Sequence, residues 1–211
     1  MGNVYTCLYF YVYSVIIECE QKYEKSEHSI NDLETYAFDI WHKQLSDEEK
    51  QAIRYYTEAG AEVINEVLNT ANADITPRLQ AYIDHISSAI HKFDLKQDIS
   101  VFRGVKREEY EQIKRNSHNV LKTFMSFKST TLDETLATRW TTKENINYDT
   151  MIVDGRYVLI VQVPRTARGA YIEPITANPG EKEFILDKQT CYSVLDEIEH
   201  NEIRYLILGV E

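Results

Sequence analysis

Residues 179–186 read PGEKEFIL, a turn followed by an apolar run. Proline and glycine favour the turn, and the run from Phe184 to Leu186 predicts a buried strand. Glu181 and Glu183 stand two positions apart at the start of this strand, so the pleat places both carboxylates on one face. Neighbouring carboxylates raise one another's pKa, which makes the pair a candidate catalytic site. The alternative interpretation is a solvated strand edge.

Strand signals recur through the second half of the chain. Short runs rich in β-branched and aromatic residues lie at 99–103, 122–130, 157–163, 183–187 and 203–210. Two short helices are predicted among them, one near 107–116 and one after Thr131, which is the expected N-cap of the second.

The first half shows helical periodicity instead. Ser46 and Glu49 form a capping box at the start of one helix, which Gly60 is expected to end. Thr76 and Pro77 open a later helix with a clearer apolar face.

Length and composition suit a single globular domain. The chain has 211 residues, of which 43% are hydrophobic and 27% charged, so it is able to bury a core and too apolar for a disordered chain. Helices followed by strands predict an α+β fold. We expect one domain over residues 29–211, with a helical lobe at 29–95 and a strand-rich core at 96–211. Residues 1–28 carry an aromatic, apolar run that we expect to pack on the domain or on a partner.

Charge and residue spacing exclude several classes of protein. A net charge of -11 and a pI of about 5.1 argue against a surface dedicated to a nucleic-acid backbone. The three cysteines and six histidines show no metal-ligand spacing, so no metal is expected. The seven glycines form neither GxGxxG nor a P-loop, so any nucleotide must be held in another way.

The apolar run at 4–17 is too short to span a bilayer and lacks the basic start of a signal peptide. We therefore expect no membrane span and no standard export signal. The expected place of action is a cytosol, that of the producing cell or of a target cell reached by secretion or injection along a non-classical route.

Two further motifs carry side chains suited to a dinucleotide. Arg103 ends an alternating strand and is followed by Gly104, which allows a ligand close to the backbone. Guanidinium matches pyrophosphate oxygens in pairs. Ser129 and Thr130 lie where a later strand turns into a helix, and neutral hydroxyls there orient a carboxylate without neutralising it. The alternative interpretation of Arg103 alone is a surface ion pair, and that of the hydroxyl residues alone is a helix cap.

In this order the three motifs resemble the Arg…Ser-Thr-Ser…Glu-x-Glu signature of the ADP-ribosyltransferase exoenzyme family, which includes the clostridial C3-like and actin-modifying toxins. The third hydroxyl residue here is Thr131 in place of serine. The likeness extends upstream through residues 45–50, 53–57 and Ile64-Asn65, and so spans residues 40–210.

The resemblance implies a mixed α/β fold of two packed sheets, with NAD as the substrate in the cleft between them and no metal. Arg103 would bind the NAD phosphates with Gly104 beside it. Tyr56 and Asn65 would line the same site from the helical lobe. Thr130 would support the strand edge at the cofactor.

The resemblance also assigns the catalytic roles. Glu183 would bind the nicotinamide-ribose hydroxyl and stabilise the ribosyl cation as nicotinamide departs. Ser129 would position Glu183, and Glu181 would hold the incoming nucleophile. A fixed carboxylate beside an oxocarbenium-like centre agrees with the chemistry of glycoside cleavage.

Three hypotheses for function follow. The first is a mono-ADP-ribosyltransferase toxin or effector that modifies an arginine on a protein, because Glu181 and not glutamine opens the pair. The second is a related toxin that modifies RNA or DNA and is neutralised by an antitoxin or immunity partner. The third is a non-catalytic interaction module with the same fold. The sequence leaves the acceptor and the oligomeric state open.

Overall fold

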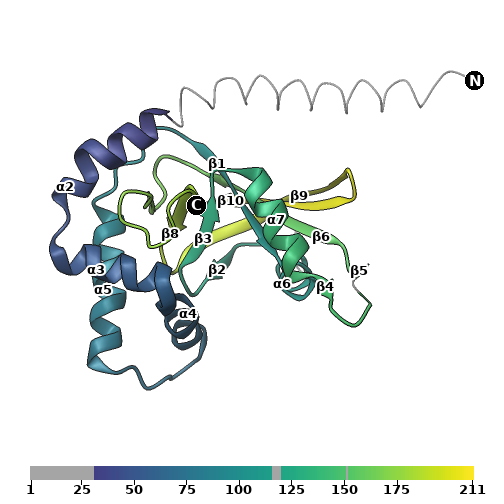
Figure 1. Cartoon of the computed structure of the whole chain (residues 1–211), viewed down its shortest axis with the longest axis horizontal. Coiled ribbons are helices and arrows are strands. Elements are labelled where there is room, and N and C mark those ends of the chain that lie inside the picture. Colours follow the sequence, from purple (N-terminus) through teal and green to yellow (C-terminus); the bar gives the residue numbers. More distant parts are fainter. Residues whose placement is uncertain (1–30, 116–119, 151) are drawn as a thin grey trace, which may run out of the picture.

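The computed structural model describes residues 31–115, 120–150 and 152–211 (Figure 1). The aromatic segment 1–28, expected to pack on the domain or on a partner, lies outside the described residues. The helices of the N-terminal half gather on one side of the molecule, the sheet fills its middle, and the later helices and a long hairpin lie toward the other side (Figure 1).

The N-terminal part is helical as predicted. Its elements are η1 (Ala37–Trp41), α2 (His42–Gln44), α3 (Asp47–Tyr55), η2 (Tyr56–Gly60), α4 (Ala61–Asn69) and α5 (Pro77–His91), where η marks a π-helical turn. The Ser46 hydroxyl accepts a hydrogen bond from the backbone of Glu49, whose carboxylate accepts one from the backbone of Ser46, so the capping box is confirmed. Thr76 is likewise confirmed as the N-cap of α5. Within the described ranges, no helix is long and apolar enough to cross a membrane.

The prediction that Gly60 ends a helix is wrong. The chain stays helical from α3 through η2 into α4, and Gly60 keeps a helical backbone. A Cβ at this position would lie 2.5 Å from the ring of Tyr55. Glycine is needed here for close packing of that ring, not to stop the helix.

The second part is mostly sheet. Its strands are β1 (Ile99–Val105), β2 (Lys122–Phe124), β3 (Lys128–Thr131), β4 (Ile146–Asn147), β5 (Ile152–Val153), β6 (Arg156–Val163), β7 (Gly169–Tyr171), β8 (Glu183–Leu186), β9 (Thr190–His200) and β10 (Ile203–Val210). Its helices are α6 (Arg107–Lys114) and α7 (Glu134–Glu144). Each predicted strand run contains a strand, although the run at 122–130 divides into β2 and β3.

Eight of these strands form one sheet in the order β2-β9-β10-β6-β1-β3-β8-β7, and β4 pairs with β5 separately. Only the β6–β10 pair is parallel among the pairs described. The mixed α/β fold is confirmed. The two sheets expected from the resemblance are two parts of one hydrogen-bonded sheet, because β1 and β3 pair at Phe102 and Thr131.

One hydrophobic core joins the two parts of the chain. It contains Trp41 and Ile53 from the helices, Val101 and Leu206 from one part of the sheet, and Phe184 from the other, each at most 1% exposed. Burial of this continuous apolar core is the main stabilising contribution to the fold.

The N-cap of α7 differs from the prediction. Asp133, and not Thr131, accepts the backbone hydrogen bonds of Thr135 and Leu136 at the helix start. The Thr131 hydroxyl instead donates to the carbonyl of Glu181 at 2.7 Å. Thr131 is therefore a connection between β3 and the turn before β8.

Gly104 has a packing role that the sequence analysis did not anticipate. A Cβ on Gly104 would lie 2.1 Å from the carbonyl oxygen of Ala137 and 2.7 Å from the backbone nitrogen of Thr141, both on α7. The direction expected to face a ligand is thus filled by a helix. Thr141 completes the contact by donating to the carbonyl of Val105 at 2.9 Å.

We predict that Gly104→Ala lowers the free energy of unfolding by roughly 1–3 kcal/mol, because α7 must move away from β1. Urea denaturation measures the change. Gly209→Ala is the matched control, since the three atoms nearest to its Cβ would all belong to the side chain of Leu195, the closest at 3.1 Å. Equal stability losses in the two variants would contradict the packing explanation.

Candidate active site

The candidate catalytic carboxylate is fixed by strand pairing. In the antiparallel β3–β8 pair, Thr131 lies opposite Glu183 and Ser129 opposite Ile185. Directly opposed residues project to the same face, so Ser129 and Glu183 share one face of the sheet. Glu183 is 7% exposed.

Burial raises the pKa of the Glu183 carboxyl to about 7. A hydrogen bond from the Ser129 side chain opposes this rise, and the nearby charge of Glu181 adds to it. Removal from water disfavours the charged form of a carboxyl group, so a buried glutamate releases its proton less readily. The hydroxyl of Ser129 and, to a smaller extent, the charge of Arg103 favour the ionised carboxylate here.

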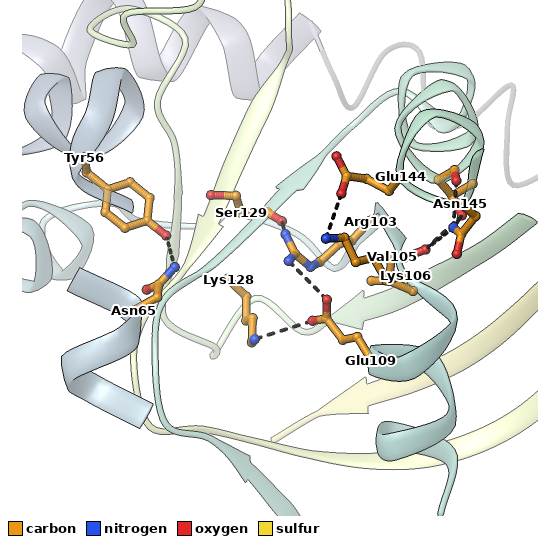
Figure 2. Close-up of polar contacts among 11 residues, drawn as sticks. Tyr56, Asn65, Arg103, Val105, Lys106, Glu109, Lys128, Ser129, Glu144 and Asn145 are labelled. Carbon is orange, nitrogen blue, oxygen red and sulfur yellow. Dashed lines mark hydrogen bonds and ion pairs between the residues drawn. The ribbon is translucent and has the colours of Figure 1, made fainter. Parts of the chain in front are cut away.

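Arg103 reaches β3 from the neighbouring strand β1 (Figure 2). Its Nη1 donates to the carbonyl oxygen of Ser129 at 3.0 Å, and its Nη2 donates to Glu109 at 3.4 Å. Among the described residues, the Arg103 Nε is buried and finds no hydrogen-bond partner. Buried polar groups are normally satisfied, so an unpaired donor on a guanidinium is consistent with a ligand site.

Glu109 and Lys128 join this cluster, although the sequence analysis gave them no role. Lys128 Nζ lies 3.6 Å from Glu109, which therefore stands between two cations (Figure 2). Burial raises the pKa of the Glu109 carboxyl, but the charges of Arg103 and Lys128 outweigh it and leave that pKa lowered. Burial lowers the pKa of Lys128. A detectable signal was the position of Glu109 in the first turn of the helix that directly follows β1.

Tyr56 and Asn65 approach the same cluster from the helical lobe. Asn65 Nδ2 donates to the Tyr56 hydroxyl at 3.1 Å (Figure 2), and the Oδ1 of Asn65 is buried without a partner in the described part of the chain. Burial raises the pKa of Tyr56, and hydrogen bonding with Ser129 opposes the rise. Charges on Glu183 and Arg103 also act on this phenol, which places all of these side chains in one site.

Glu181 lies in the turn before β8 and is less buried than Glu183. Burial raises the pKa of its carboxyl, and the charge of Glu173 raises it further. Gly180 has a φ of +94°, and Lys182 has a φ of +47°, a left-handed conformation that costs a non-glycine residue on the order of 1 kcal/mol. The turn is therefore held in place by its surroundings.

Thr130 and Gly104 make contacts outside the cluster. The buried hydroxyl of Thr130 donates to the carbonyl of Phe184 at 2.6 Å, and alternation along β3 places it on the face opposite Ser129. Gly104 faces α7. The structure thus gathers six of the predicted residues, which are Tyr56, Asn65, Arg103, Ser129, Glu181 and Glu183, and gives the other two structural contacts.

Comparison with known proteins identifies the family. Residues 31–210 match the ADP-ribosyltransferase exoenzyme family, and the chain belongs to that family. It is 32% identical over 175 residues to the NAD(+)-arginine ADP-ribosyltransferase EFV of Enterococcus faecalis, a match that covers 81% of this chain. The chain spans 33% of the length of that relative.

Two solved structures show the same fold. Plx2a, an ADP-ribosyltransferase toxin from Paenibacillus larvae, has a TM-score of 0.69 at 20% identity, with 89% of this chain and 96% of Plx2a covered. C3stau2 from S. aureus, solved with NAD, has a TM-score of 0.64 at 21% identity, with 86% and 92% covered.

We predict that Glu183→Gln stabilises the fold in a pH-dependent way. A carboxyl whose pKa is raised from 4.5 to about 7 on folding contributes stability below pH 4.5 that is lost as the pH rises through 7. Glutamine does not ionise, so its advantage over glutamate should grow from pH 5 to pH 8 and reach roughly 3 kcal/mol.

Urea denaturation at both pH values measures this effect. Exposed Glu202, at the tip of the β9–β10 hairpin, provides the control variant Glu202→Gln for loss of one charge. A stability difference that stays constant between pH 5 and pH 8 would argue against a buried, proton-binding Glu183.

Proposed function

We propose that this protein is a mono-ADP-ribosyltransferase that moves ADP-ribose from NAD to an arginine side chain of a protein and releases nicotinamide. The observation that carries the proposal is the meeting of Arg103, Ser129 and Glu183, from three separate strands, beside Tyr56 of the helical lobe. Each residue type matches one part of the chemistry.

The polar groups of the cluster suit NAD. Arg103 and Lys128 carry two positive charges against one negative charge on Glu109, so this part of the cluster attracts a pyrophosphate. The buried Nε of Arg103 is an unused donor, and the buried Oδ1 of Asn65 is an unused acceptor. Bound NAD offers acceptors on its phosphates and donors on its ribose hydroxyls and amide. Bound NAD would therefore supply hydrogen-bond partners for Arg103 Nε and Asn65 Oδ1, which have none among the described residues.

Glu183 supplies the charge at the reacting carbon. When the bond between C1′ of the ribose and the nicotinamide nitrogen breaks, its electron pair leaves with neutral nicotinamide and positive charge develops on the ribose. An ionised Glu183, oriented by Ser129, stabilises that charge in a site with little water. A preorganised carboxylate of this kind lowers the activation barrier, because it does not have to reorganise as the charge develops.

Glu181 supports arginine as the acceptor. Glu181 lies two residues before the start of β8 and is more accessible than Glu183. A carboxylate binds a guanidinium through paired hydrogen bonds and accepts the proton that the attacking nitrogen releases. The name of the Enterococcus faecalis relative also includes arginine as the acceptor. We propose a protein in the cytosol of a target cell as the source of that arginine.

We predict that the chain labels protein when it is incubated with radiolabelled NAD and a cell lysate. Protease should remove the label and nuclease should not. Glu183→Ala should lower the rate about a hundred- to a thousandfold, because the developing charge loses its stabilising carboxylate. Label removed by nuclease would favour a nucleic-acid acceptor, and no label without nicotinamide release would favour a non-catalytic module.

We predict that Arg103→Lys raises the KM for NAD about tenfold or more, because an ammonium group keeps the charge but loses the paired donors. Initial rates of nicotinamide release over a range of NAD concentrations measure this. Lys106→Gln is the control for loss of a nearby cation, since Lys106 pairs with Glu144 on the exposed side. An unchanged KM in Arg103→Lys would remove Arg103 from the NAD site.

A further inference from the structure

The turn that carries Glu181 is held by another carboxylate, that of Glu173. The backbone N–H of Lys182 donates to Glu173 Oε2 at 3.0 Å, and the backbone N–H of Gly180 donates to Glu173 Oε1. One oxygen of Glu173 thus accepts the backbone N–H of the residue before Glu181, and the other accepts that of the residue after it. Backbone N–H groups that converge in this way form a concave site that favours a negative charge.

The peptide that follows Glu181 is held at both ends. Its carbonyl oxygen, which belongs to Glu181, accepts the Thr131 hydroxyl at 2.7 Å, and its N–H, which belongs to Lys182, is held by Glu173. One peptide before Glu181, the N–H of Gly180 in the Pro179–Gly180 peptide is held by the other oxygen of Glu173. The orientation of the Glu181 side chain therefore depends on Glu173 from both sides.

Glu183 does not depend on Glu173 in this way. The β3–β8 pairing fixes Glu183 opposite Thr131. The far part of the same loop is also fixed independently, because Ala177 N–H donates to the Thr57 hydroxyl at 2.9 Å and Asn178 Nδ2 donates to the Thr57 carbonyl at 2.8 Å. Loss of Glu173 would therefore loosen the segment at Glu181 while the loop and the strand on either side stay attached.

We propose that Glu173 is a positioning residue for the acceptor step: its carboxylate holds the amides of Gly180 and Lys182 so that Glu181 faces the incoming guanidinium. This inference rests on the proposed function of the same site. Glu173 acts through Glu181 and needs no contact with NAD. Its removal should consequently impair transfer to an acceptor more than cleavage of NAD by water.

Glu173 also affects the charge state of the Glu181 carboxyl. Burial chiefly raises the pKa of Glu181, and the charge of Glu173 raises it further. The charge of Glu173 also raises the pKa of Glu183, but it is the last in order of size among the causes there. A neutral residue at position 173 removes the second contribution at Glu181, so the pKa of Glu181 should fall. The acid limb of transfer activity should then move to lower pH, a shift that a purely structural role of Glu173 would not produce.

The test compares the wild-type chain with Glu173→Gln, using agmatine as a small guanidino acceptor. Glutamine matches the size of glutamate but offers one acceptor oxygen in place of two, so one of the two amides loses its partner. We expect kcat/KM for agmatine to fall at least tenfold, NAD hydrolysis without agmatine to change less than threefold, and the KM for NAD to stay constant. Glu202→Gln should leave all three unchanged.

Two further measurements separate geometry from charge. Backbone hydrogen exchange should show at least tenfold faster exchange at Gly180 or Lys182 in Glu173→Gln, with unchanged protection in β8. Glu173→Asp keeps the charge but is one methylene shorter. It should lose transfer activity without the shift of the acid limb that Glu173→Gln shows.

The outcomes distinguish this inference from the proposed function. A wild-type chain that neither hydrolyses NAD nor modifies agmatine would overturn both. An active wild-type chain with equal losses of hydrolysis and transfer in Glu173→Gln, or with exchange at Gly180 and Lys182 unchanged, would overturn the role of Glu173 alone.

Discussion

Strand β3 is the element on which the site depends, because its backbone pairs with both parts of the sheet. On one side Thr131 pairs with Phe102 of β1, and on the other Thr131 lies opposite Glu183 of β8. The carbonyl of Ser129 also accepts the guanidinium of Arg103. These contacts of β3 thus set the distance between the cation and the carboxylate. Displacing β3 by one residue would turn the Ser129 hydroxyl to the opposite face and separate it from Glu183.

The site holds charged groups in surroundings that disfavour charge, and each one is stabilised in a different way. Glu109 is paired with two cations. Glu183 has the hydroxyl of Ser129 and remains partly protonated near neutral pH. The fold therefore concentrates its electrostatic cost at the residue that the proposed chemistry needs ionised, while the surrounding apolar core supplies the stability that offsets this cost.

The sequence predicted those parts of the molecule that depend on interactions between neighbouring residues. Strand runs, the Ser46 capping box and the Thr76 cap follow from propensity and spacing, and the ordered motifs identified the cluster around Arg103 and Glu183. Contacts between distant segments were not predictable. Glu173 meets Gly180 only because a loop folds back, and the direction of a Cβ at Gly104 depends on where α7 packs. Strand β9 was missed because its outer half carries four charged or titratable side chains, which hide the two-residue period.

The π-helical turn η2 determines which way Asn65 points. In a regular α-helix each residue advances about 100°, so the nine steps from Tyr56 to Asn65 would place the two side chains on opposite sides. The wider turn at Tyr56–Gly60 accommodates one additional residue, which takes about 100° from that angle and brings the amide within reach of the phenol. Winding the same residues as a regular α-helix would rotate α4 by about 100° about its own axis and turn Ile64 toward Tyr56 in place of Asn65, with every strand of the sheet undisturbed.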